Sequence, residues 1–151
     1  MTATLRSVLV LLVGIFLLMA GSGPLTTLLG ARLEATAASP PAIGAVMAAN
    51  FAGLTLGSLF AHRVILRAGH IRAFTAFASI LSATALVYPI HLDFGLWGTL
   101  RLIEGFCMAG VYVCIESWLN DSATAATRGK ILALYMSSLY FGQASGQLLL
   151  T

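Results

Sequence analysis

The sequence predicts an all-helical integral membrane protein with five transmembrane helices. Its 151 residues are 59% apolar, and only 9% are charged. Soluble domains are typically about 45–50% apolar and about 25% charged, so this chain lacks the polar residues that a water-exposed surface needs. With two cysteines, it also does not fit a disulfide-stabilised scaffold, and its composition excludes an ordinary water-soluble enzyme or a disordered chain. Four long stretches carry no formal charge, namely residues 7–31, 35–62, 73–92 and 131–151.

These stretches are long enough to cross a bilayer, because about 20 apolar helical residues span a hydrocarbon core of roughly 30 Å. A further predicted span contains three ionisable residues but is bracketed by Trp97 and Trp118. Their separation suits two interfacial aromatic belts. Together the predicted spans are residues 8–29, 42–61, 73–91, 97–118 and 131–151. Short polar loops connect them, and no separate domain is expected.

The first predicted span has an alternative interpretation as a cleaved signal peptide. Arg6, the apolar run 8–18 and the small residues 20–22 fit that pattern. Apolar character resumes at residues 25–29, which is longer than a signal core needs and favours a retained helix. Pro24 is compatible with such a helix, because neighbouring helices can satisfy the backbone groups that a proline frees.

The second and fifth predicted spans share the pattern G-x-x-x-G-x-L. Its two glycines are Gly53 and Gly57 in one helix, and Gly142 and Gly146 in the other. Small residues four positions apart let helix backbones approach closely, so these glycines are predicted to pack helices together. The likeness is either generic membrane packing or the sign of a three-helix repeat, in which both helices occupy equivalent places.

Lysine and arginine predict the orientation of the chain. One side of the predicted topology holds six of them, whereas Arg32 alone falls in a loop on the other side. This imbalance predicts a multi-pass protein of the cell membrane with a cytoplasmic N-terminus. Because the cations are divided among several loops, no nucleic-acid partner is expected. The six are Arg6, Arg63, Arg67, Arg72, Arg128 and Lys130.

Ionisable residues at membrane depth are costly and therefore indicate function by default. Arg101 and Glu104 lie one helical turn apart and can pair, although Arg101 can instead snorkel to the outer interface. Glu116 lies near the inner interface, within reach of basic loop residues. The polar face of this helix is expected to meet a cavity or a neighbouring helix; at 100° per residue it comprises Arg101, Glu104, Gly105, Met108, Tyr112 and Glu116.

Other polar residues inside the predicted spans have two interpretations. Asn50, Gln143 and Gln147 can hydrogen-bond neighbouring helices, or they can line an aqueous path. Cys107 and Cys114 lie too far apart along one helix to form a disulfide and are expected to pack. No metal-binding or cofactor motif and no catalytic constellation is found, so neither a metal nor a cofactor is expected.

The segment 62–72 resembles the cytoplasmic motif G-x-x-x-D-R-x-G-R-[KR] of the major facilitator superfamily (MFS). Arg67 and Gly69 match it and Arg72 supplies a basic end, whereas His62 replaces the first glycine and Leu66 the aspartate. In the fourth span, Arg101-x-x-x-Gly105-x-x-x-Ala109 is similar to a family motif often linked with proton coupling. Arg128-Gly129-Lys130 resembles the R-G-[RK] that precedes the family's fifth helix. Further runs resemble the YcaD-like branch, namely Ile115-Glu116-Ser117 and Gly146-Gln147-Leu148-Leu149.

This resemblance implies a twelve-helix fold whose two six-helix halves rock about a central cavity. The chain would hold five helices of a truncated N-terminal half. By the family pattern, the first and fourth helices line the cavity, and the second and fifth meet the other half. The pattern also implies an inner gate in which Glu116 meets Arg67 or Arg72. The gate loops would comprise Arg67, Gly69, Arg72, Arg128, Gly129 and Lys130.

The leading functional hypothesis is transmembrane transport of a small solute, with H⁺ as candidate coupling ion. The partners are then the solute, the lipid bilayer and the missing C-terminal helices. The alternative is a non-transporting membrane scaffold or partner subunit, which would dock through the small-residue faces of its second and fifth helices. An intramembrane enzyme is a third and less favoured class. The candidate pathway residues are Arg101, Glu104, Tyr112, Glu116, Asn50, Gln143 and Gln147.

Overall fold

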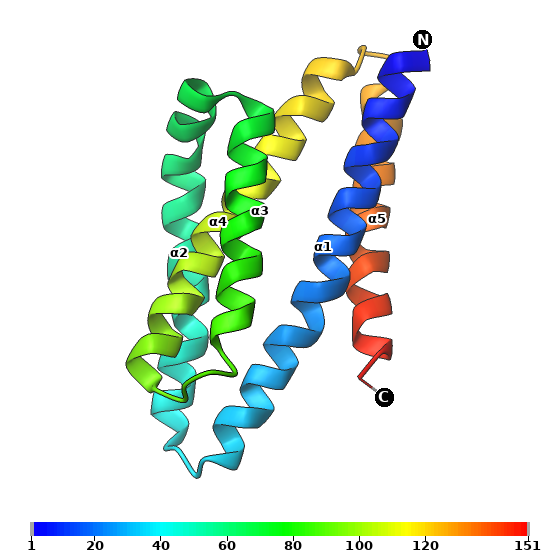
Figure 1. Ribbon diagram of the computed structural model, residues 1–151. Helices are drawn as coiled ribbons and strands as arrows, with labels where there is room; N and C mark the ends of the chain where they lie inside the picture. The colour runs from blue at the N-terminus through cyan, green and yellow to red at the C-terminus, as the bar shows by residue number, and fades with distance from the viewer. Residues whose placement is uncertain (1, 151) are drawn as a thin grey trace. The chain divides into compact units, whose positions relative to one another are not determined.

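The computed structural model describes the backbone of residues 2–150 and the side chains of residues 8–150. This part of the chain is helical, with no strand among the described residues (Figure 1). The all-helical class predicted from the sequence is confirmed. The helices are α1 (Thr2–Ala35), α2 (Pro40–Ala68), α3 (His70–Val87), α4 (Phe94–Ser122) and α5 (Arg128–Leu148).

The helices are longer, and the loops shorter, than the uncharged stretches suggest. α1 continues without a break through Pro24 to Ala35, so Arg32 lies on a helix rather than in a loop. α2 extends two turns beyond the predicted end at residue 61. Charged residues at helix ends can snorkel to the interface, so charge does not end a membrane helix. α5 begins earlier than predicted and ends at Leu148; of the predicted span 131–151, residue 151 lies outside the described residues.

Among the described residues, four helices are long and apolar enough to cross a membrane, namely α1 from Val8 onward, α2, α3 and α4. α5 has 21 residues but a more polar composition, so it does not belong to this set. Many large apolar side chains are exposed on the helices, far more than a water-soluble surface tolerates. They suit contact with lipid; examples are Leu9, Val10, Leu17, Phe51, Leu59, Leu86, Tyr140 and Phe141.

Contacts divide the chain into two compact units. Unit 1 comprises Met1–Arg32 with Glu116–Thr151, and unit 2 comprises Leu33–Ile115. Unit 1 therefore contains most of α1 and all of α5, and unit 2 contains α2, α3 and most of α4. This division is not visible in the sequence, from which a single domain was expected.

Unit 2 is held together by close approach of α2 and α4, which run in the same direction (Figure 1). Gly53 and Gly57 of α2 face the backbone carbonyls of Leu102 and Phe106. In the opposite direction, Gly105 of α4 faces the carbonyl of Asn50. Each of these carbonyls occupies the space that a Cβ on the opposing glycine would need. The three glycines, predicted to pack helices, thus lie at the contact between α2 and α4.

Unit 1 shows the same device between α1 and α5, which also run in the same direction. Gly142 faces the carbonyl of Phe16, and Gly146 faces the carbonyl of Ala20. In a three-helix repeat, α1 to α3 form the first triplet, and α4 and α5 begin the second. In both units, two glycines four positions apart on the second helix of one triplet then meet two carbonyls four positions apart on the first helix of the other triplet. This common register supports the three-helix repeat over generic packing.

Two hydrogen bonds stabilise the turn between α3 and α4. The carboxylate of Asp93 accepts a hydrogen bond from the amide of Leu96 at 2.7 Å. It thereby caps the first turn of α4 and complements the helix dipole. The carbonyl of His91 accepts a hydrogen bond from Nε1 of Trp97 at 2.9 Å.

Trp97 is fully buried, and its ring packs edge-to-face on Tyr88 with centroids 5.3 Å apart. Trp97, predicted to mark an interfacial belt, therefore packs within the protein: its indole closes the α3–α4 turn, where the ring finds an aromatic partner and its N–H an acceptor. Trp118, at the other end of the predicted belt, is half-buried in unit 1.

Candidate functional site

The centre of the candidate site is an ion pair on α4 within unit 2. Nη1 of Arg101 lies 2.9 Å from Oε2 of Glu104, and both side chains are about 6% exposed. The two residues therefore pair within α4, at the spacing that makes such a pair possible, and both are buried among the helices. A buried pair satisfies the charge of each partner, because an uncompensated ion would be far more costly there.

Helix α3 supplies a third polar group to this pair. Oγ1 of Thr84 lies 3.4 Å from Oε1 of Glu104, and 2.9 Å from the carbonyl of Leu81. Thr84 is buried, so the polar face of α4 meets a neighbouring helix at this point. Sequence analysis missed Thr84, because threonine is common in membrane helices and its register against α4 depends on how α3 packs.

Asn50 fixes the other side of this segment of α4. Its Nδ2 donates a hydrogen bond to the carbonyl of Arg101 at 3.2 Å. Since the carbonyl of Asn50 also faces Gly105, this residue ties α2 to α4 through both its backbone and its side chain. Of the two interpretations of Asn50, the structure favours hydrogen bonding between helices. Tyr112, on the same helix as the ion pair, is half-buried.

Gln143 and Gln147 contact α1 within unit 1. Nε2 of Gln147 donates to the carbonyl of Gly23 at 3.0 Å and lies 2.9 Å from Oγ1 of Thr27. Gln143 packs with its Cγ close to Gly23, 3.3 Å from where a Cβ would stand. Both glutamines therefore hold α5 against α1, in the manner of polar residues that bind membrane helices together.

Glu116 begins the part of α4 that belongs to unit 1, and its carboxylate is exposed. Oε1 of Glu116 accepts a hydrogen bond from the hydroxyl of Tyr135 on α5 at 3.4 Å. Tyr135 is fully buried. The sequence offered no signal for this pair, because the tyrosine lies 19 positions away in a region predicted only as an apolar span.

The predicted gate residues of unit 2 lie where α2 passes into α3. Gly69 is the single residue between the two helices and has φ of +83°. Its amide donates to the carbonyl of Ile65 at 2.8 Å and ends α2. Only glycine adopts this conformation without strain, which explains why glycine stands at this place in the motif. Arg67 and Arg72 lie in the adjoining helical turns and are exposed.

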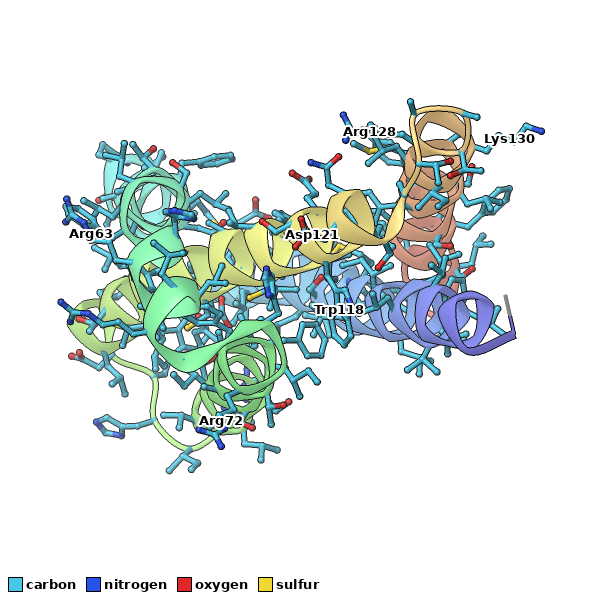
Figure 2. The ribbon with its side chains drawn as sticks, turned by 90° about the horizontal axis from the view of Figure 1, so that it is seen from above. Arg63, Arg72, Trp118, Asp121, Arg128 and Lys130 are labelled. Atoms are coloured by element: carbon cyan, nitrogen blue, oxygen red, sulfur yellow. The ribbon has the colours of Figure 1, made fainter. Side chains whose placement is uncertain are left out.

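The remaining predicted gate residues open α5 in unit 1. Arg128, Gly129 and Lys130 form its first turn and are exposed. Figure 2 shows the side chain of Lys130 extending away from the helix, and Asp121 at the end of α4. Gly129 has open space around its Cα, since a Cβ there would meet no atom within 4 Å.

Long lipid-compatible helices, held together by glycines and carrying a buried ion pair, define a multi-pass helical membrane protein. The family model of the Major Facilitator Superfamily matches residues 11–151. The chain belongs to the Major Facilitator Superfamily. The match includes α5, so this helix is part of the family domain.

Several relatives in bacteria are similar over the whole chain. An uncharacterised MFS-type transporter of Yersinia enterocolitica is 33% identical over 99% of this chain and 39% of its own length. YcaD of Salmonella enteritidis, also an uncharacterised MFS-type transporter, is 32% identical over 100% of this chain and 40% of its own length. The resemblance to the YcaD-like branch is thus confirmed. The chain spans about 40% of the length of these relatives. No solved structure matches it.

Proposed function

We propose that this chain forms N-terminal helices of a secondary transporter that moves a small solute across the plasma membrane. In this proposal the N-terminus is cytoplasmic, α5 is a fifth span, and further helices of the same transporter complete the translocation path. The relatives support the proposal, since they are MFS-type transporters of which this chain matches about 40%. The names of these relatives give no solute.

The observation that carries the proposal is the buried pair of Arg101 and Glu104. Two ionised groups inside a membrane helix stabilise a fold poorly compared with apolar residues of similar volume. Their presence at membrane depth therefore favours a functional role. In our proposal Glu104 binds and releases the coupling proton. Protonation of Glu104 would break its ion pair with Arg101, so that the guanidinium can bind an anionic group of the solute or another carboxylate.

We propose fewer pathway residues than the sequence offers as candidates. Asn50, Gln143 and Gln147 are engaged in contacts between helices, so we assign them to assembly. The proposed pathway then rests on Arg101, Glu104 and Tyr112, with Glu116 as a second candidate proton-binding group nearer the inner surface.

Coupling can be tested in proteoliposomes that contain the complete transporter. The reading frame beyond codon 151 and the intact mass of the membrane-extracted product establish first which chain to use. Pyranine inside the vesicles then reports proton movement while candidate solutes are added in turn. We expect solute-dependent proton flux that Glu104→Gln abolishes. Glu34→Gln, which alters an exposed carboxylate at the end of α1, is the matched control. The coupling claim is contradicted if solute flux is unchanged by the proton gradient and by the double substitution Glu104→Gln with Glu116→Gln.

We also propose that Glu116 takes part in an inner gate with Arg67 or Arg72, as the family pattern implies. The hydrogen bond from Tyr135 would hold the carboxylate in place for this contact. Glu116→Gln in the intact transporter should weaken closure of the inner gate and raise the accessibility of cavity cysteines from the inner side. Unchanged transport together with unchanged cysteine accessibility on both faces would remove Glu116 from the gate.

The proposed orientation has an independent test. Arg63→Cys and Arg32→Cys each place a thiol at an exposed position on opposite predicted sides, and the native cysteines are buried. In intact cells, a membrane-impermeant maleimide should label Cys at position 32 and spare Cys at position 63. The reverse pattern would invert the topology.

The alternative of a non-transporting scaffold loses its main support. It required the small-residue faces of α2 and α5 to be free for a partner. Within unit 2 the face of α2 is occupied by α4, and within unit 1 the face of α5 is occupied by α1.

A further inference from the structure

Three arginines surround the end of unit 2 where α2 passes into α3. Arg63 and Arg67 lie in the last turns of α2, and Arg72 lies in the first turn of α3. We call these three residues the basic rim. All three are exposed. Figure 2 shows the side chains of Arg63 and Arg72 extending outward from their helices in different directions. The rim therefore presents its charges around the periphery of the unit rather than toward one enclosed point.

The acidic residues of unit 2 lie away from the rim. Glu34 precedes α2 and Asp93 precedes α4, so both lie at the opposite ends of the helices. Glu104 is buried and paired with Arg101. At the position where the resembled family motif has an aspartate, this chain has Leu66. Within the described part of unit 2, the rim thus keeps its full positive charge.

Apolar side chains stand beside these guanidinium groups. Leu66 is 72% exposed and Ile71 is 64% exposed, so each presents an apolar surface next to an arginine. Arg63 lies over the ring of Phe60, and the Cζ atom of Arg63 is 5.0 Å from the centroid of that ring. A soluble phosphate would need donors that converge, and it would gain nothing from leucine and isoleucine. A phospholipid has both a phosphate for the arginines and acyl chains for the apolar side chains.

We propose that the basic rim selectively binds the headgroups of anionic phospholipids, of the phosphatidylglycerol type, with Leu66 and Ile71 against the acyl chains. Basic residues next to a membrane surface each favour anionic lipid by a factor of about five. Within unit 2 no acidic side chain lies near these three arginines, so they should give a clear preference over zwitterionic lipid. The proposal is independent of any transport activity.

The chain also offers a matched set of cations for comparison. Arg128 and Lys130 share their end of unit 1 with Asp121 and Glu116, and Figure 2 shows Asp121 at the end of α4. Arg32 lies close to Glu34 in the sequence. Acidic residues therefore lie in the same segments of the sequence as these cations, which we expect to contribute less to lipid selection than the rim does.

The test compares lipid binding in nanodiscs made from equal amounts of phosphatidylglycerol and phosphatidylcholine. Native mass spectrometry of the released protein measures the ratio of the two lipids that remain bound. We expect the unaltered chain to retain mainly phosphatidylglycerol, and the triple variant Arg63→Gln, Arg67→Gln and Arg72→Gln to lose at least ten-fold of that preference. The control triple variant Arg32→Gln, Arg128→Gln and Lys130→Gln removes the same charge and should lose less than three-fold.

A second variant keeps the proposal testable if the triple variant does not fold. Leu66→Asp places an acid in the rim at an exposed position and removes no arginine, and it should lower the preference about five-fold. Millimolar inorganic phosphate should leave the bound lipid in place, and its release by phosphate would assign the rim to a soluble anion. The proposal is overturned if the unaltered chain retains both lipids equally, if the control triple variant loses as much as the rim variant, or if Leu66→Asp leaves the preference unchanged.

Discussion

Gly146 of α5 lies directly against the carbonyl oxygen of Ala20 in α1, where a Cβ would have no room. Ala20 is four residues before Pro24, and proline has no amide hydrogen to offer that carbonyl. The proline and the glycine are therefore matched: the Ala20 carbonyl lacks its usual amide partner at position 24, and the backbone of α5 approaches that carbonyl closely at Gly146.

Substitution of Gly146 by alanine should accordingly separate α5 from α1. We expect a loss of about 1–3 kcal/mol, the usual cost of overpacking a tight contact. The loss is measured as the apparent free energy of unfolding in an SDS titration. Gly21→Ala is the matched control, since a Cβ on Gly21 would meet no atom within 4 Å. Equal effects of the two substitutions would contradict the proposed role of Gly146.

The ion pair on α4 predicts strongly non-additive behaviour. Glu104→Leu or Arg101→Leu alone leaves the partner charge buried and should cost about 3–5 kcal/mol. The double substitution Arg101→Leu with Glu104→Leu should cost less than either single change, because no buried charge remains. A double-mutant cycle in SDS titration measures the coupling, and additive effects would show that the two side chains do not depend on each other.

Thr84 should contribute to this pair modestly. Its hydroxyl is 3.4 Å from the Glu104 carboxylate, so Thr84→Val is expected to cost about 1 kcal/mol or less. Thr84→Ser keeps the hydroxyl and should cost less than the valine substitution. In the Glu104→Gln background, Thr84→Val should have a smaller effect. The same unfolding assay measures all three differences. If Thr84→Val lowers the free energy of unfolding equally in the Glu104→Gln background, the hydroxyl of Thr84 does not act through Glu104.

Substitutions of Gly69 test the conformation of the turn between α2 and α3. Any other residue at φ of +83° is strained, so Gly69→Ala should destabilise the chain by about 1–2 kcal/mol. Gly69→Asn should cost about as much, because φ of +83° with ψ of 158° lies outside the left-handed helical region that asparagine tolerates. Gly129→Ala serves as the control, since that helical glycine has open space around it. Thermal unfolding followed by circular dichroism compares the three variants.

The buried cysteines predict slow thiol chemistry. Cys107 and Cys114 are 2% and 1% exposed and form no disulfide. In the folded chain we expect a small maleimide to label them at least ten-fold more slowly than a cysteine placed at the exposed position 66. Denaturation should remove the difference. Fast labelling of the native pair would mean that α4 is less well covered than the structure indicates.

Much of this architecture could be predicted from the sequence because a membrane allows few structures. Charge-free stretches located the helices, and the glycine spacing identified the close contacts. Helix ends were less predictable. Arg32, Arg63 and Arg67 suggested loops, yet all three lie on helices, since a long basic side chain can reach the interface from inside the final turn.

The candidate site was predictable only in part. The spacing of Arg101 and Glu104 was sufficient to predict their pairing, because that contact lies within one helix. Thr84 and Tyr135 approach from other helices, so their positions depend on packing that sequence spacing does not encode. The burial of Trp97 could not be predicted for the same reason, because it depends on how the indole packs against Tyr88.

The contact between α1 and α5 also has a consequence for biosynthesis. Gln147 and the Gly23 carbonyl that it binds are 124 positions apart. Ribosomes add about 5–20 residues per second, so α1 exists for about 6–25 s before its partner has been made. During that interval the shielding of the Ala20 carbonyl by Gly146 is absent, and a nascent α1 needs lipid, the insertion machinery or a chaperone to accompany it until α5 emerges.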